Sequence, residues 1–202
     1  MTIIGCDPSV TKTGVVIRRP DGTYSSFLAV PPAKAQDPAR LYWIAATVVT
    51  NCHLKPEEDV LLVIEHPTPR RQLDANFPLF WRLREEFAWH HPGRTLIVWP
   101  SQLNKFATGD GNITEIGGAV VTQWGDCLPK ETNPDILDAL ALCKFGEAHR
   151  AFELGFGKPP DYKWMKDVQW DTVSMDGTGK KRRERVAVDD HATFGICKGE
   201  SE

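Results

Sequence analysis

Four carboxylates lie at positions where a charged side chain is unfavourable unless a partner or a cation compensates its charge. Asp7 follows an apolar, β-rich run at residues 2–6, and Glu65 closes a second apolar run at residues 60–65. Asp135 and Asp138 are three residues apart in an otherwise apolar helical pattern, so they share one helical face. A carboxylate that ends a buried strand needs a partner or a metal ion, because burying it charged and unpaired costs several kcal/mol.

Carboxylates in this number are typical of a site for a hard divalent cation. A lone acid at a strand end is often simply solvated, and an acid in the first helical turn is favoured by the helix dipole. Both interpretations stay open for each acid taken singly, and Asp135 fits the second better than Asp138 does. Taken together, the four acids favour Mg²⁺ or Mn²⁺, which are bound by carboxylate, water and phosphate oxygens.

The elements that position these acids follow from the hydrophobic pattern. Continuous apolar runs predict buried strands, and apolar residues at helical spacing predict helices that cover them. The expected strands are residues 2–6, 15–18, 24–30, 60–65 and 95–99. The expected helices are residues 37–52, 72–90, 101–106, 114–124 and 133–154. This order predicts a three-layer α/β domain with a mixed sheet.

Length and composition exclude several classes of protein. The chain has 202 residues, of which 41% are hydrophobic and 25% charged, which predicts a soluble globular protein. No apolar run approaches the ~18 residues that a membrane helix needs, and the N-terminus does not resemble a secretion signal. Five cysteines without a Cys-x-x-Cys pair give no support for a zinc or redox motif. The net charge of −3 means that any polyanion must be met by a local basic patch.

The composition changes near residue 155. We therefore predict two parts, a catalytic domain at residues 1–154 and a C-terminal extension at residues 155–202. The extension carries a glycine-containing turn signal at residues 177–179, followed at residues 180–185 by the run Lys-Lys-Arg-Arg-Glu-Arg. This pattern predicts a basic hairpin, which would contact DNA or simply form a solvated tip.

Four motifs, ordered between residues 3 and 142, resemble those of the RuvC-type Holliday-junction resolvases. The first two are Ile-Ile-Gly-Cys-Asp-Pro-Ser-Val-Thr-Lys-Thr-Gly at residues 3–14 and Val-Ile-Glu at residues 63–65. The third is Val-Trp-Pro-Ser-Gln-Leu-Asn-Lys at residues 98–105 with the following Gly-Asp-Gly, and the last is Asp-Ile-Leu-Asp-Ala-Leu-Ala-Leu at residues 135–142. Each motif alone is weak, but the ordered set is fairly specific.

The resemblance implies a ribonuclease-H-like fold, with a mixed five-stranded sheet and helices on both faces. It implies a metal-dependent, structure-selective endonuclease that resolves four-way (Holliday) junctions by phosphodiester hydrolysis, in DNA recombination and repair. The family's catalytic and metal-binding acids correspond here to Asp7, Glu65, Asp135 and Asp138. The expected cofactor is Mg²⁺, replaceable by Mn²⁺, with two ions per active site. The expected partners are branched DNA and a second copy in a homodimer, with no nucleotide cofactor and no membrane.

The chain also departs from the family pattern. Ser9 stands where glycine is common, residues 66–71 lack the family's aromatic residue, and Glu115 lies where a basic residue is expected. Lys105 retains a basic residue just upstream. Such divergence would suit a bacteriophage-encoded member, acting in the cytoplasm of a bacterial or phage-infected cell.

DNA has to be held by local positive charge. The basic residues expected in or near the loops around the acids are Arg70, Arg71, Arg82, Arg84, Arg94 and Lys105. Those expected from the basic hairpin are Lys180, Lys181, Arg182, Arg183 and Arg185. Aromatic residues are dense at residues 77–89, which indicates core packing or a dimer interface.

Other functions remain open on the sequence. A nuclease of the same fold could act on flaps, other branched DNA or RNA–DNA hybrids, because the aromatic residue after Glu65 is missing. Proteins of other classes are a non-catalytic DNA-binding protein and an actin-like nucleotide-binding ATPase, whose first strand also ends in aspartate before a Thr-rich turn.

Overall fold

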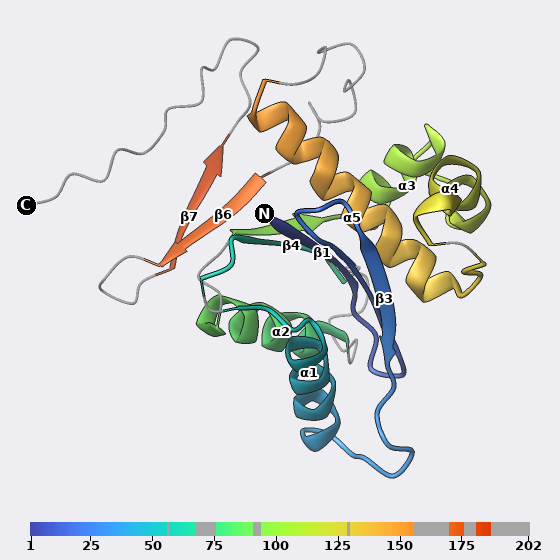
Figure 1. The fold of residues 1–202 in the computed structure, drawn as a ribbon. Coiled ribbons are helices and arrows are strands. Elements are labelled where there is room, and N and C mark those ends of the chain that lie inside the picture. Colours follow the sequence, from blue (N-terminus) through green and yellow to red (C-terminus); the bar gives the residue numbers. More distant parts are fainter. Residues whose placement is uncertain are drawn as a thin grey trace, which may run out of the picture.

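The computed structural model of the chain describes residues 1–55, 57–67, 76–90, 94–128 and 130–155, and the backbone of two strands at 170–175 and 181–186. Five strands form one mixed sheet in the order β3-β2-β1-β4-β5 (Figure 1). β1 pairs antiparallel with β2 and parallel with β4, while β3 and β5 form the edges. The strands are β1 (Thr2–Asp7), β2 (Thr13–Arg18), β3 (Tyr24–Ala29), β4 (Val60–Glu65) and β5 (Arg94–Val98).

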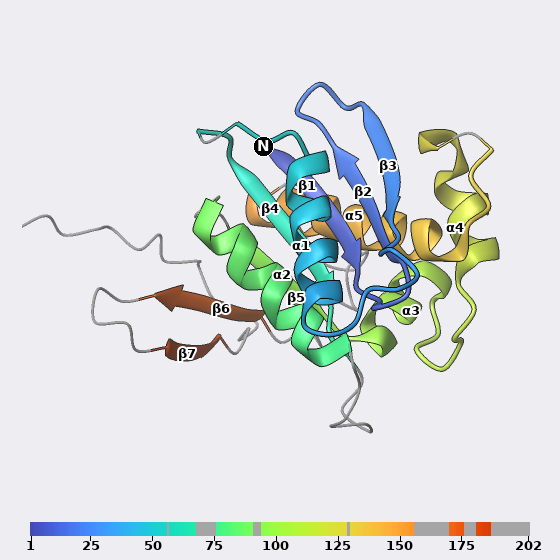
Figure 2. The ribbon, with the colours of Figure 1, turned by 90° about the horizontal axis from the view of Figure 1, so that it is seen from below.

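Helices cover both faces of this sheet (Figures 1 and 2). One face is covered by α1 (Ala39–Asn51) and α2 (Asn76–His90). The other is covered by α3 (Pro100–Thr108), α4 (Gly117–Trp124) with the short 3-10 turn η1 (Gly125–Cys127), and α5 (Pro134–Glu153). The three-layer α/β architecture with a mixed five-stranded sheet is therefore confirmed.

Alternation along the strands builds two hydrophobic cores. Successive residues of β1 point to opposite faces, so Ile3 packs under α5 and Ile4 packs under α1 and α2. In β1, β2 and β4 every residue except the last is buried, which is why these strands are continuously apolar. The last residue of β1 is Asp7 and that of β4 is Glu65, so two acids lie where the buried core ends.

α5 packs very closely on β1 and β2, and glycines make this approach possible. A Cβ on Gly5 would lie 2.1 Å from the Ala139 carbonyl oxygen, and one on Gly14 would lie 2.1 Å from the Asp135 carbonyl oxygen. These two contacts join the end of β1 and the start of β2 to the first turns of α5. The acidic end of α5 is thus held against the strand that carries Asp7.

The observed helices differ from the predicted ones mainly where they begin. α2 begins at Asn76, so Pro78 lies in the first turn, where its missing N–H breaks no helical hydrogen bond. α4 begins at Gly117 rather than at residue 114. In α2, Phe80 and Phe87 are buried, as core packing requires, whereas Trp89 is 85% exposed.

The C-terminal strands β6 (Trp170–Met175) and β7 (Lys181–Val186) pair antiparallel, with β6 running beside β5. The pairing agrees with the predicted hairpin. The division of the chain near residue 155 stays a prediction, because residues 156–169 lie outside the described part. Among the described residues, no helix combines the length and apolar character needed to cross a membrane.

Candidate active site

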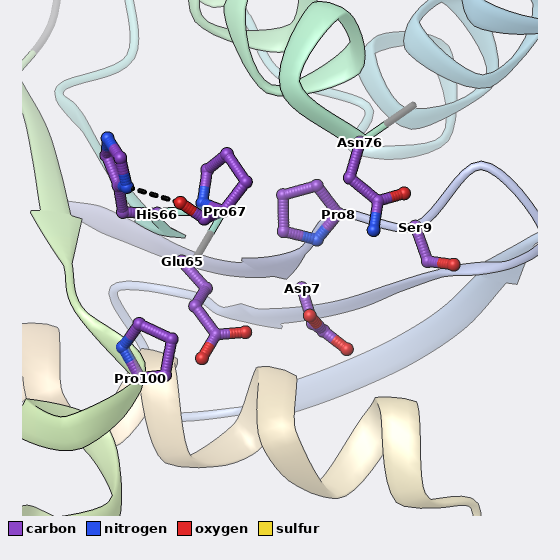
Figure 3. Close-up of a pocket in the computed structure, with 8 residues that line it drawn as sticks. All are labelled: Asp7, Pro8, Ser9, Glu65, His66, Pro67, Asn76 and Pro100. Atoms are coloured by element: carbon purple, nitrogen blue, oxygen red, sulfur yellow. Dashed lines mark hydrogen bonds between the residues drawn. The ribbon is translucent and has the colours of Figure 1, made fainter. Parts of the chain in front are cut away.

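The first half of the candidate site lies at the ends of two neighbouring parallel strands. β1 and β4 run side by side, with Cys6 opposite Ile64, so the acids that follow these residues meet at one sheet edge. Asp7 and Glu65 both line a pocket, and Figure 3 shows their side chains close together above α5. The pocket is completed by Pro8, Ser9, His66, Pro67, Asn76 and Pro100.

The second half comes from the N-terminal turns of α5. Asn133 caps this helix, because its side-chain oxygen accepts a hydrogen bond from the Asp135 N–H at 3.0 Å, and Pro134 follows the cap. Asp135 and Asp138 then lie one turn apart, as their spacing predicts. Both acids act electrostatically on Asp7, so the structure brings all four predicted acids to one place.

Burial and mutual repulsion make these acids hard to ionise. Burial, followed by the charge of Asp138, raises the pKa of Asp7. Burial, followed by the charge of Asp7, raises the pKa of Glu65 well above its usual range. A hydrogen bond between the two carboxyl groups lowers the pKa of Asp7 and adds to the rise in the pKa of Glu65. Burial and the charge of Asp135 raise the pKa of Asp138 to about 6.

A cluster of acids with raised pKa values is a functional signal rather than a stabilising one. Carboxylates that cannot all ionise together are found in catalytic sites, where a bound cation or substrate restores the balance of charge. Among the described residues, one basic side chain forms an ion pair with a member of this cluster: Lys12 Nζ lies 2.5 Å from Asp135 Oδ2.

The donor set fits a hard divalent cation in its chemistry. Four carboxylates offer only oxygen ligands, and Mg²⁺ takes one or two of them together with water and phosphate oxygens. As they stand, no three acidic, histidine or cysteine side chains of the described residues are gathered as ligands of a single ion. The acids are instead held in pairs, Asp7 with Glu65 and Asp135 with Lys12.

Several residues of the site were not predicted from the sequence. Asn76, at the start of α2, accepts a hydrogen bond from the Val10 N–H at 3.0 Å and so fixes the loop after β1. His66 stacks on Trp99, with ring centroids 4.1 Å apart. Figure 3 shows the hydrogen bond that its Nδ1–H donates to the Pro67 carbonyl oxygen, at 2.7 Å. No local pattern marks either residue, because each contact joins segments far apart or depends on a side-chain rotamer.

The predicted DNA-binding residues are only partly described. Arg70, Arg71 and Lys180 lie outside the described residues, and only the backbone is described for Lys181, Arg182, Arg183 and Arg185. Lys105 lies in the last turn of α3, half-buried, with its Cβ facing Gly111.

Three other arginines were expected near the acids, and each has a partner within the described structure. Arg94 is at the start of β5, the end opposite to Glu65, and pairs with Glu153 at 2.7 Å. Arg82 pairs with Glu86 within α2, and the buried Arg84 guanidinium lies over the Trp81 ring at 4.7 Å. The expectation that Arg94 lies near the acids was wrong, because this arginine is at the strand end opposite to Glu65. Arg82 and Arg84 lie on the predicted helix and have partners within it.

Comparison with known proteins identifies the fold. No protein-family model and no curated protein sequence matches the chain. Two solved structures of Thermus thermophilus RuvC resemble it, one with a TM-score of 0.56 at 18% identity and one, in complex with a Holliday junction substrate, with 0.59 at 17%. Both alignments cover 79% of this chain and 99% of the other. The chain therefore has the ribonuclease-H-like fold of RuvC.

Proposed function

We propose that this chain is a metal-dependent endonuclease that resolves four-way DNA junctions by phosphodiester hydrolysis. The observation that carries the proposal is the convergence of Asp7, Glu65, Asp135 and Asp138 from β1, β4 and α5, with three of their pKa values raised. The fold agrees, since one of the structures it resembles is T. thermophilus RuvC in complex with a Holliday junction substrate.

The four acids would hold Mg²⁺ or Mn²⁺, two ions per active site. Bound there, such ions would supply an activated water, charge relief at phosphorus and a stabilised 3′-oxygen leaving group. Asp7 shares a hydrogen bond with Glu65 and is affected by the charges of both acids of α5, so it is the acid that would act together with all the others in holding metal. The protein's own part is to place the carboxylates and leave the pocket open to a phosphate, since phosphoryl transfer depends on positioning and electrostatics.

We propose that DNA is held by Arg70, Arg71, Lys105 and the basic run of the C-terminal strands. Phosphate contacts of this kind supply affinity without sequence preference and weaken as salt rises. Neutralising Lys181, Arg182 and Arg183 together should weaken binding to all DNA forms and reduce the salt slope by about one unit per lost contact. Unchanged affinity and slope would leave the run as a solvated tip. A homodimer would let each subunit cut one of two equivalent strands.

A panel of labelled substrates tests the activity. Four-way junction, flap, linear duplex and RNA–DNA hybrid are incubated with the full chain in Mg²⁺, in Ca²⁺ and in excess EDTA. We expect paired cuts in the four-way junction with Mg²⁺, binding without turnover in Ca²⁺, and no cutting in EDTA. The Asp7→Asn variant is the control for contaminating nucleases.

The same panel separates the alternatives. Faster cutting of flaps or hybrids would assign the chain to a different branch of the same fold. Junction binding without cutting in Mg²⁺ or Mn²⁺ would identify a non-catalytic DNA-binding protein. Undiminished cutting in EDTA would contradict the metal site.

A further inference from the structure

Within the part of the chain that the structure describes, Lys12 is the basic residue that pairs with the acid cluster, and the proposed function leaves its role open. Its Nζ lies 2.5 Å from Asp135 Oδ2, with the two side chains 40% and 21% exposed. The other ion pairs between described residues involve acids outside the cluster, namely Asp37, Glu58, Glu86, Glu147 and Glu153. Lys12 is therefore distinguished by the acid with which it pairs.

The loop between β1 and β2 holds Lys12 in this place. Thr13 Oγ1 accepts a hydrogen bond from the Ser9 N–H at 3.2 Å and donates to the Ser9 carbonyl oxygen at 2.9 Å. The Val10 N–H is bonded to Asn76 of α2. Gly14 then brings the start of β2 against the Asp135 backbone. The ion pair thus joins two segments that the fold presses together.

The pair changes the charge balance of the whole cluster. Asp135 is one of the charges that raise the pKa values of Asp7 and Asp138. A lysine ammonium on Asp135 offsets this negative charge, as a divalent ion would. Two cations at one carboxylate repel each other, so the ammonium of Lys12 and a divalent ion oppose each other's binding to Asp135.

We propose that Lys12 is an internal counter-ion of Asp135 that competes with the divalent ion for this carboxylate. Resting on the proposed function, this assigns Lys12 a positioning role: it holds Asp135 before the metal arrives and sets the metal concentration at which the site fills. Because the pair is partly exposed, its contribution is that of a surface ion pair, about 0.2–1 kcal/mol, or up to roughly fivefold in affinity.

Metal binding without DNA tests the proposal. Binding of Mn²⁺ to the full chain is measured by calorimetry and by electron paramagnetic resonance of the free ion. Lys12→Met should bind Mn²⁺ about two- to fivefold more tightly than wild type, and Lys12→Arg should bind it as wild type does. Lys34→Met, which removes an exposed lysine before α1, is the matched control and should leave the affinity unchanged.

A double-mutant cycle shows whether Lys12 acts through Asp135. In the Asp135→Asn background, Lys12→Met should no longer change Mn²⁺ affinity, because the pair is already broken. Unchanged or weaker binding by a folded Lys12→Met protein, or equal tightening in both backgrounds, would overturn the proposal. Thermal melting checks folding, and Lys12→Gln, which also removes the charge and should tighten binding in the same way, replaces the methionine variant if that variant does not fold.

Asp7→Asn separates this proposal from the function on which it rests. If Asp7→Asn weakens Mn²⁺ binding and Lys12→Met leaves it unchanged, only the role of Lys12 fails. If wild type binds Mn²⁺ no better than Asp7→Asn does, the metal site itself fails and the proposed function fails with it.

Discussion

The two ends of α5 carry acids in opposite surroundings. At the N-terminal end, Asp135 and Asp138 lie near Asp7 and Glu65. Repulsion between the carboxylates there adds to burial in raising the pKa of Asp7 and that of Asp138. At the C-terminal end, burial alone would raise the pKa of Glu153, but hydrogen bonds and electrostatic attraction from basic neighbours outweigh it and lower this pKa to about 2. These neighbours are His149, Arg150 and Arg94.

Glu147, nearer the middle of α5, repeats the second arrangement. Its carboxylate lies 3.0 Å from Arg18 Nε and 3.0 Å from Lys144 Nζ, and it accepts a hydrogen bond from the Tyr24 hydroxyl. Helix α5 therefore has paired acids that stabilise the fold and an acid cluster in which the Lys12 pair is the only ion pair of the described residues. Clustered like charges oppose folding, so their presence indicates selection for chemistry rather than for stability.

The largest expected effect comes from removing an acid of the cluster. Asp7→Asn should reduce junction cleavage about a thousandfold or more, because one amide cannot replace a shared carboxylate. Junction binding should be retained or tightened, since one charge that repels phosphate is gone. Glu65→Gln should behave alike, and the double variant should lose little more, because acids acting as one unit are not additive. Single-turnover cleavage rates are measured for the three variants. Full activity of a folded Asp7→Asn protein would contradict the proposed mechanism.

The next effect tests how closely α5 must approach the sheet. Gly14→Ala would place a methyl group 2.1 Å from the Asp135 carbonyl oxygen, so the first turn of α5 must move. We expect a loss of about 2–4 kcal/mol in the free energy of unfolding and a matching loss of cleavage. Gly22→Ala is a control with open space around it, although its positive φ adds backbone strain. Denaturant unfolding measures both, and equal stability of Gly14→Ala and wild type would contradict the packing.

A smaller effect concerns stability and pH at the acidic end. The pKa of Asp138 is about 6 in the folded protein against an ordinary value of 3.8, so folding favours the protonated side chain. Its contribution to the free energy of unfolding is fully present below pH 3.8 and is lost as the pH rises through 6. Asp138→Asn should therefore be more stable than wild type at pH 7.5, by about 1–3 kcal/mol. The advantage should vanish below about pH 4. Thermal melts across this range check the sign, and a destabilised variant at pH 7.5 would contradict it.

The smallest effect is at the other end of the helix, with the opposite sign. The lowered pKa of Glu153 stabilises the fold above its ordinary value of 4.5, and this contribution is lost as pH falls towards 2. Glu153→Gln should be less stable than wild type at pH 7 by about 1 kcal/mol, since the site is partly exposed to solvent. The difference should shrink in acid. A stabilising Glu153→Gln would remove the contrast between the two ends.

The acidic side of this contrast could be predicted from the sequence, because it depends on strand ends and helical spacing. Two apolar runs that close on Asp7 and Glu65 locate one sheet edge, and the three-residue step from Asp135 to Asp138 locates one helix face. That Asp7 and Glu65 are neighbours depends on the parallel pairing of β1 with β4, which the structure shows.

The rest depends on tertiary placement, which a local pattern does not encode. Lys12 and Asp135 are far apart in the chain, and nothing in the sequence shows that they pair. The position of Arg94 looked suitable for DNA contact, but its strand runs in the direction that places it beside Glu153. The direction of the Lys12 side chain determines the first contact, and the direction of strand β5 determines the position of Arg94.

Under the proposed function, the acidic end of α5 takes part in DNA cleavage and the paired end only stabilises the fold. Single-turnover cleavage of a four-way junction in Mg²⁺, compared between Asp138→Asn and Glu153→Gln, tests this most directly. Both variants remove one carboxylate from the same helix. We expect Asp138→Asn to lose cleavage about a hundredfold or more, and Glu153→Gln to cleave within about twofold of wild type. Comparable rates for the two folded variants would contradict the account.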